Sequence, residues 1–149
     1  MIIAVDGPAA SGKGTIAKAL ARHYGLPCLD TGLLYRAVGL SVLKRGGDPD
    51  IKADALAACD FGDEILADPA LRSEAVGSLA SRVSVHQAVR DALIARQRDF
   101  APQPGGAILD GRDLGTVIAP VLTISFSGSI TPSFKAPTAT MILMIEPGV

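Results

Sequence analysis

The sequence has few cysteines, no long apolar stretch and almost no net charge. Cys28 and Cys59 lack metal-binding and redox spacing, so we expect two small buried side chains in a reduced protein. His23 and His86 also lack partners, and we predict no metal site built from side chains alone.

No stretch reaches the roughly 18 apolar residues of a membrane span, and no basic segment opens a secretion signal. A formal net charge of −1 favours neither nucleic acid nor an anionic membrane as a partner. We therefore expect a cytoplasmic protein.

The charges that are present are distributed unevenly along the chain. With 149 residues, 48% of them apolar and 19% charged, the chain fits one soluble globular domain. Of its 14 basic and 15 acidic residues, only Lys135 and Glu146 lie after residue 119. We therefore expect a folded core over residues 1–120 and an atypical tail over 121–149.

Strand-like and helix-like segments alternate along the core. Short apolar runs predict buried strands, and apolar residues at helical spacing predict helices. The strands are expected at 1–5, 28–29 and 107–109, and the helices at 13–24, 33–44 and 85–100. Residues 51–80 predict short helical pieces, with Asp68-Pro69 as a turn or helix start. This alternation predicts an α/β fold in which helices cover a parallel sheet.

A glycine-rich segment separates the first strand from the first helix. It has the spacing G-x-x-x-x-G-K, which is typical of a loop whose backbone N–H groups surround phosphates at a helix N-terminus. We predict that Lys13 reaches the outer phosphates as a point charge. The alternative is an ordinary glycine-rich turn. The predicted strand before this segment and the predicted helix after it favour phosphate binding over that alternative. The predicted ATP-binding residues are Gly7, Pro8, Ala9, Ala10, Ser11, Gly12, Lys13, Gly14 and Thr15.

The residue after Lys13 departs from the strict form of this motif. A Ser or Thr normally follows the lysine and binds Mg²⁺, whereas here Gly14 comes between Lys13 and Thr15. The form G-K-G-T is similar to that of nucleoside-monophosphate kinases. It argues against GTPases and motor ATPases.

Two further motifs follow the second and third predicted strands. Leu29-Asp30-Thr31-Gly32-Leu33-Leu34-Tyr35-Arg36 and Asp110-Gly111-Arg112-Asp113-Leu114-Gly115-Thr116-Val117 would meet the phosphate loop at one edge of the sheet. Adenylate kinases carry different motifs at these places. Together with Ala80-Ser81-Arg82-Val83 and Val89-Arg90, these motifs resemble the cytidylate kinase family from residue 1 to about 120.

The resemblance implies a P-loop NTPase-like, three-layer αβα fold. The implied reaction transfers the γ-phosphoryl of ATP, with Mg²⁺, to CMP or dCMP and gives CDP or dCDP. We expect the protein to be a monomer. Residues of about 30–100 would include the region that binds the monophosphate.

The resemblance also assigns roles to individual residues. Lys13 and Arg112 would stabilise the transferring phosphoryl, and Asp110 would orient Mg²⁺ through water. Cytosine offers an N4 amine to a carboxylate and N3 and O2 acceptors to a guanidinium, whereas uracil has a carbonyl in place of the amine. The resemblance implies that the CMP phosphate is held by Thr31, Arg36 and Arg112 and that the base is read by Ser81, Arg90 and Asp113. We expect Tyr35 to pack on the ring.

The tail does not follow the family pattern. A cytidylate kinase continues with an arginine-rich lid, whereas residues after Pro120 contain one lysine and no arginine. Only residues 121–126 suggest a strand. We expect a fold incomplete at the C-terminus and weak or absent catalysis, and we hypothesise that the tail is read out of frame. A nucleotide-binding module without catalysis, or another small-molecule P-loop kinase, is the alternative.

Overall fold

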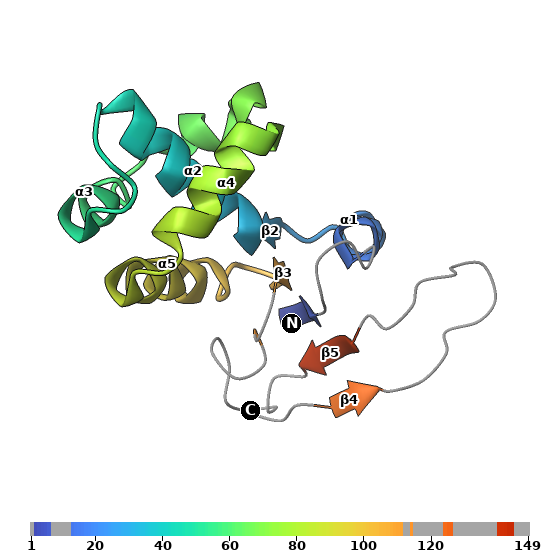
Figure 1. Ribbon diagram of the computed structural model, residues 1–149. Helices are drawn as coiled ribbons and strands as arrows, with labels where there is room; N and C mark the ends of the chain where they lie inside the picture. Colours follow the sequence, from blue (N-terminus) through green and yellow to red (C-terminus); the bar gives the residue numbers. More distant parts are fainter. Residues whose placement is uncertain (1, 7–12, 112–113, 115–123, 127–139, 145–149) are drawn as a thin grey trace. The chain divides into compact units, whose positions relative to one another are not determined.

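The computed structural model describes residues 2–6, 13–111, 114, 124–126 and 140–144 (Figure 1). The chain divides into two compact units. We call Met1–Asp30 together with Gln97–Val149 the sheet unit, and Thr31–Arg96 the helical unit.

The sheet unit contains five strands in the order β2-β3-β1-β5-β4. β1 and β2 both pair with β3 in parallel, whereas β5 is antiparallel to β1 and to β4. The parallel part and the helix that follows β1 confirm the predicted P-loop NTPase-like α/β class. The elements of this unit are β1 (Ile2–Asp6), α1 (Lys13–Tyr24), β2 (Cys28–Asp30), the end of α5 (Gln87–Phe100), β3 (Ala107–Gly111), β4 (Ile124–Phe126) and β5 (Thr140–Met144).

The two central parallel strands, β1 and β3, bury both of their faces. Successive side chains of a strand point to opposite sides, so β1 directs Ile3 and Val5 to one face and Ala4 to the other. Ile3 and Val5 pack with Ala17 of α1, whereas Ala4 clusters with Leu109 and with residues that follow α5. A strand buried on both faces explains why its sequence is a continuous apolar run.

The helical unit is built around two helices, α2 (Thr31–Lys44) and α4 (Glu74–Val83), which pack closely together. A Cβ added at Gly39 of α2 would lie 2.8 Å from the Cβ of Leu79 and 3.1 Å from the backbone nitrogen of Ala80. Glycine therefore sets how closely the two helices approach. α2 begins at Thr31, two residues before the predicted start, a difference typical of helix ends.

Short helices connect α2 to α4, as predicted for residues 51–80. They are α3 (Lys52–Ala57) and the 3₁₀ helices η1 (Asp63–Ala67) and η2 (Pro69–Arg72). Asp68 caps η2 by accepting a hydrogen bond from the Ala70 N–H at 2.9 Å. Ser73 caps α4 by accepting one from the Val76 N–H at 3.2 Å. Both caps place a polar oxygen on N–H groups that have no partner within the helix.

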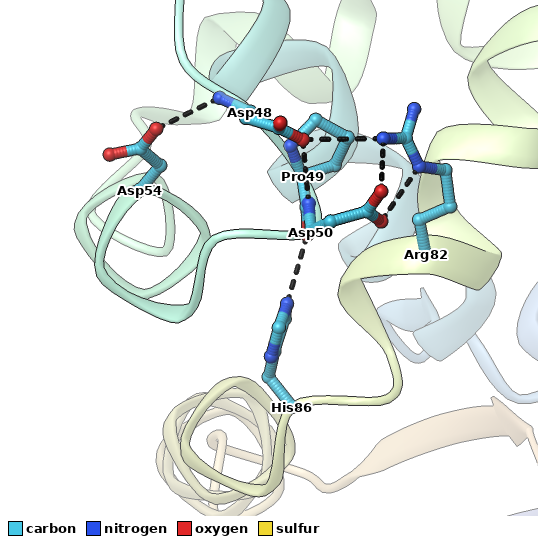
Figure 2. A network of polar contacts seen from close by, with 6 residues as sticks. All are labelled: Asp48, Pro49, Asp50, Asp54, Arg82 and His86. Carbon is cyan, nitrogen blue, oxygen red and sulfur yellow. Dashed lines mark hydrogen bonds and ion pairs between the residues drawn. The ribbon is translucent and has the colours of Figure 1, made fainter.

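A polar network links the turn after α2 to the far end of α4 (Figure 2). The Arg82 guanidinium binds the Asp50 carboxylate twice, at 2.8 and 2.6 Å, and the Asp48 carboxylate at 3.2 Å. His86, just before α5, contacts the carbonyl oxygen of Pro49 at 2.9 Å. The two-pronged geometry of the Arg82–Asp50 pair fixes the direction of the turn.

Two expectations differ from the structure. Cys28 is exposed and Cys59 only partly buried, so the prediction of two buried thiols is wrong. Cys28 lies on β2, an edge strand of the sheet, which accounts for its exposure. β5 was not predicted. Of the helices that the structure describes, none combines the length and apolarity needed to cross a membrane.

Replacing Gly39 by alanine should destabilise the helical unit. The new methyl group would meet Leu79 and the α4 backbone, and the expected loss is about 1 to 2 kcal/mol after the better helix propensity of alanine is counted. Urea unfolding measures the difference. Ser78→Ala, on the exposed side of α4, is the matched control and should change stability by less than about 0.5 kcal/mol. Equal stability of Gly39→Ala and the wild type would contradict this packing.

Candidate active site

The three parallel strands end at the same edge of the sheet unit, and each ends in or next to an acidic residue. Asp6 ends β1, Asp30 ends β2 beside Asp110, and Asp110 is the next-to-last residue of β3. Lys13 begins the helix that follows β1. This edge, outside the carboxyl ends of parallel strands, is where open α/β sheets bind ligands.

Asp110 is the most perturbed acid of the edge. It is 5% exposed, and its pKa is raised from 3.8 to about 6, first by burial and then by the neighbouring Asp30 carboxylate. Asp6 adds to the rise, and the positive charges of Lys13 and Lys18 oppose it. A cation placed among these carboxylates would relieve their repulsion. Within the described ranges, however, no group of three or more His, Cys, Asp or Glu side chains is arranged to hold a metal directly.

The Asp110 carboxylate also explains the glycine that interrupts the phosphate motif. A Cβ added at Gly14 would lie 3.0 Å from Oδ2 of Asp110. The first turn of α1 can therefore approach the end of β3 because the residue after Lys13 has no side chain. A Cβ at this position would require the carboxylate to shift by a few tenths of an ångström.

Asp6 has a role that the sequence did not reveal. Its Oδ2 accepts a hydrogen bond from the backbone N–H of Leu114 at 3.2 Å, and the Leu114 side chain is buried. This contact anchors the chain within the third motif. Asp6, Asp30 and Lys18 were not predicted as site residues. In the sequence, both acids close an apolar strand, and Asp30 also lies in the second motif.

In the helical unit, two of the predicted base-binding residues lie near each other. Burial raises the pKa of Tyr35, and the positive charge of Arg90 opposes that rise, which places the guanidinium within electrostatic reach of the phenol. Arg90 itself is held by the carbonyl of Ser84 at 2.5 Å and by Oε1 of Gln87 at 2.6 Å. Both contacts come from the turn and helix start around Arg90, so its direction is set locally.

The remaining predicted residues of the helical unit lie on α2 and α4. Thr31 is the buried first residue of α2. Arg36, one turn further, donates through Nη1 to the carbonyls of Leu71 at 2.7 Å and Ser73 at 2.9 Å. Ser81 is exposed, and its hydroxyl donates to a carbonyl one turn earlier in α4 at 3.3 Å.

Several predicted residues lie outside the part of the chain that the structure describes. They include residues 7–12 of the phosphate loop, and Arg112 and Asp113 of the third motif. Of the predicted catalytic residues, the structure therefore places Lys13 and Asp110, both at the edge of the sheet unit.

Replacing Asp110 by asparagine should stabilise the protein in a pH-dependent way. Because the folded-state pKa is raised to about 6, the folded protein binds the extra proton between about pH 4 and 6, and the wild type loses stability as the pH rises through that window. With allowance for solvent screening, the gain from Asp110→Asn at pH 7.5 should be about 1 to 2 kcal/mol, and much smaller at pH 4.5. Urea unfolding at both pH values measures it.

Asp99→Asn, which removes an exposed carboxylate at the end of α5, is the control. It should give nearly the same small change at both pH values. A gain from Asp110→Asn that is equal at both pH values, or larger at pH 4.5, would show that Asp110 is not raised in the folded protein.

Comparison with known proteins assigns the chain to a family. The family model described as Cytidylate kinase matches residues 3–125. A protein named Cytidylate kinase from Methylobacterium sp. (strain 4-46) is 53% identical over 137 residues, which are 91% of this chain and 65% of that relative. Those from Rhodopseudomonas palustris (strain HaA2) and Caulobacter sp. (strain K31) are 50% and 52% identical, each over 91% of this chain. The chain spans 65% of the length of the first two of these relatives, and it belongs to the cytidylate kinase family.

Proposed function

We propose that the protein transfers the γ-phosphoryl of ATP to CMP or dCMP, giving CDP or dCDP, with catalysis weakened by a tail that supplies no arginine. The observation that carries the proposal is the edge of the sheet unit, where Lys13 of the phosphate motif and the carboxylate of Asp110 lie close together. Membership of the cytidylate kinase family supports the choice of acceptor. We propose that the protein acts in the cytoplasm as a monomer, without nucleic acid or membrane, and that residues 1–120 form its kinase core.

On the donor side, residues 7–15 would surround the ATP phosphates with backbone N–H groups. The N-terminus of α1 adds its unsatisfied N–H groups and its positive dipole end. Lys13 would neutralise charge on the transferring phosphoryl, and Asp110 would hold a water molecule of the Mg²⁺ shell. The Mg²⁺ that accompanies ATP would supply charge neutralisation on the β and γ oxygens. The Asp110 carboxylate among lysines and acids fits this indirect role, which requires no direct metal cage.

On the acceptor side, Thr31, Arg36 and Arg112 would hold the phosphate of CMP. Ser81, Arg90 and Asp113 would bind the base, and Tyr35 would pack against the ring. The proximity of Arg90 to Tyr35 supports a shared base pocket within the helical unit. The reaction itself needs alignment and charge neutralisation and no covalent intermediate with the protein.

Replacing Lys13 by alanine should reduce kcat for CMP phosphorylation by about 100- to 1000-fold, because the transition state loses a positive charge on the transferring phosphoryl. A coupled assay of ADP formation with CMP and dCMP measures the effect. Lys52→Ala, on α3, is the control and should retain wild-type turnover. Wild-type protein that binds ATP but transfers no phosphoryl to any monophosphate would instead identify a nucleotide-binding module.

Replacing Asp113 by asparagine should relax the choice of base. An amide can donate to the O4 carbonyl of uracil, which the carboxylate repels, so the preference of kcat/KM for CMP over UMP should fall by about 10- to 100-fold. Steady-state assays with CMP, UMP and AMP measure the ratio. Asp99→Asn should leave it unchanged. An unaltered CMP to UMP ratio in Asp113→Asn would remove Asp113 from the base pocket, and a preference for AMP in the wild type would indicate another small-molecule kinase.

A further inference from the structure

The side chain of Arg36 is held in one orientation by groups of the helical unit. Both N–H donors of Nη1 are used, one by the carbonyl of Leu71 at 2.7 Å and one by the carbonyl of Ser73 at 2.9 Å. The Leu71 carbonyl belongs to η2, and the Ser73 carbonyl, at the N-cap of α4, also accepts a hydrogen bond from the Gly77 N–H at 3.1 Å. Two bonds to one nitrogen fix the plane of the guanidinium as well as its position.

The opposite edge of the same guanidinium has a different environment. Nε and Nη2 donate to none of the described residues, so three of the five N–H donors of Arg36 remain for another acceptor. This edge has the two-pronged geometry that matches two oxygens of a phosphate. Gly77, in the second turn of α4, lies against the same guanidinium: a Cβ added at Gly77 would lie 2.9 Å from Nη2, 3.3 Å from Cζ and 3.3 Å from Nη1 of Arg36.

The glycine at this position is not explained by helix formation. Glycine costs about 0.5 to 1 kcal/mol relative to alanine within a helix, and Gly77 lies inside α4. The atoms that an alanine methyl would meet belong to the end of the Arg36 side chain. Such a side chain can move aside at little cost to the fold, in contrast to the Leu79 and backbone atoms that face Gly39. What the glycine protects is therefore the orientation of the guanidinium.

We propose that Gly77 is a positioning residue for the acceptor phosphate: with the carbonyls of Leu71 and Ser73, it holds the Nε–Nη2 edge of Arg36 open toward two phosphate oxygens. The inference rests on the proposed function, in which Arg36 binds the phosphate of CMP. It adds that this binding depends on a missing side chain on a different helix.

The test compares the affinity for CMP with the affinity for cytidine, which has the same base and sugar but no phosphate. Isothermal titration of the full chain gives both values, and their ratio reports the phosphate contacts alone. In Gly77→Ala the ratio of CMP affinity to cytidine affinity should fall by about 10-fold, which corresponds to the loss of about one charged hydrogen bond. The affinity for cytidine itself should change by less than about 2-fold. Urea unfolding should show a stability close to that of the wild type, because the helix propensity of alanine offsets the lost contacts of Arg36. Ser78→Ala, its neighbour on the exposed side of α4, should keep the wild-type ratio.

Two further variants test whether the effect passes through Arg36. Arg36→Lys keeps the charge but lacks the planar guanidinium with its two parallel donors. It should therefore lower the ratio of CMP affinity to cytidine affinity without any change to α4. In an Arg36→Ala background, Gly77→Ala should have no further effect on the ratio, because the methyl group then has no guanidinium to displace.

The outcomes separate the two levels of the argument. A wild-type chain that binds CMP no better than cytidine would overturn the proposed function together with the inference. A wild-type preference for CMP that Gly77→Ala or Arg36→Lys retains in full would overturn the role of Gly77 and leave the proposed function standing. Additive losses in the double variant would do the same.

Discussion

The parallel pairing of β1 and β2 with β3 is the constraint on which the candidate site depends. Parallel strands end at the same edge, so residues far apart in the sequence are brought together without contacts designed for each pair. Asp30 lies beside Asp110 through strand register alone, and Lys13 follows because α1 begins just after β1. The buried faces of β1 and β3 supply the apolar packing that holds this register.

The same constraint creates an electrostatic cost. Three carboxylates close to one sheet edge repel each other, and the pKa of Asp110 rises to about 6 in spite of two nearby lysines. A protein selected only for stability would replace a buried, strained carboxyl by a neutral side chain. Perturbed acids of this kind are concentrated at functional sites, where a bound ligand supplies the missing positive charge. The unfavourable environment of the Asp110 carboxylate therefore indicates that this carboxylate has a functional role.

The sequence predicted the elements whose signals are local. Apolar runs located β1 and β3, helical spacing located α1 and α5, and the turn residue Asp68 marked the start of η2. Interactions between distant residues could not be predicted in this way. The Asp6–Leu114 hydrogen bond joins residues 108 positions apart, and the exposure of Cys28 depends on β2 being at the edge of the sheet. Periodicity contains no information on which strand lies at an edge.

Three glycines show that the identity of a residue does not by itself reveal what that residue does in the structure. All three lie in helices, where glycine is unfavourable, and none is explained by a special backbone angle. A methyl group at Gly39 would strike the backbone of a packed helix, one at Gly14 would strike a carboxylate, and one at Gly77 would strike a movable guanidinium. The first constraint concerns the stability of the fold, whereas the other two concern charged groups proposed to act on substrates. Only the atoms opposite each missing side chain separate these cases, and those atoms come from other segments of the chain.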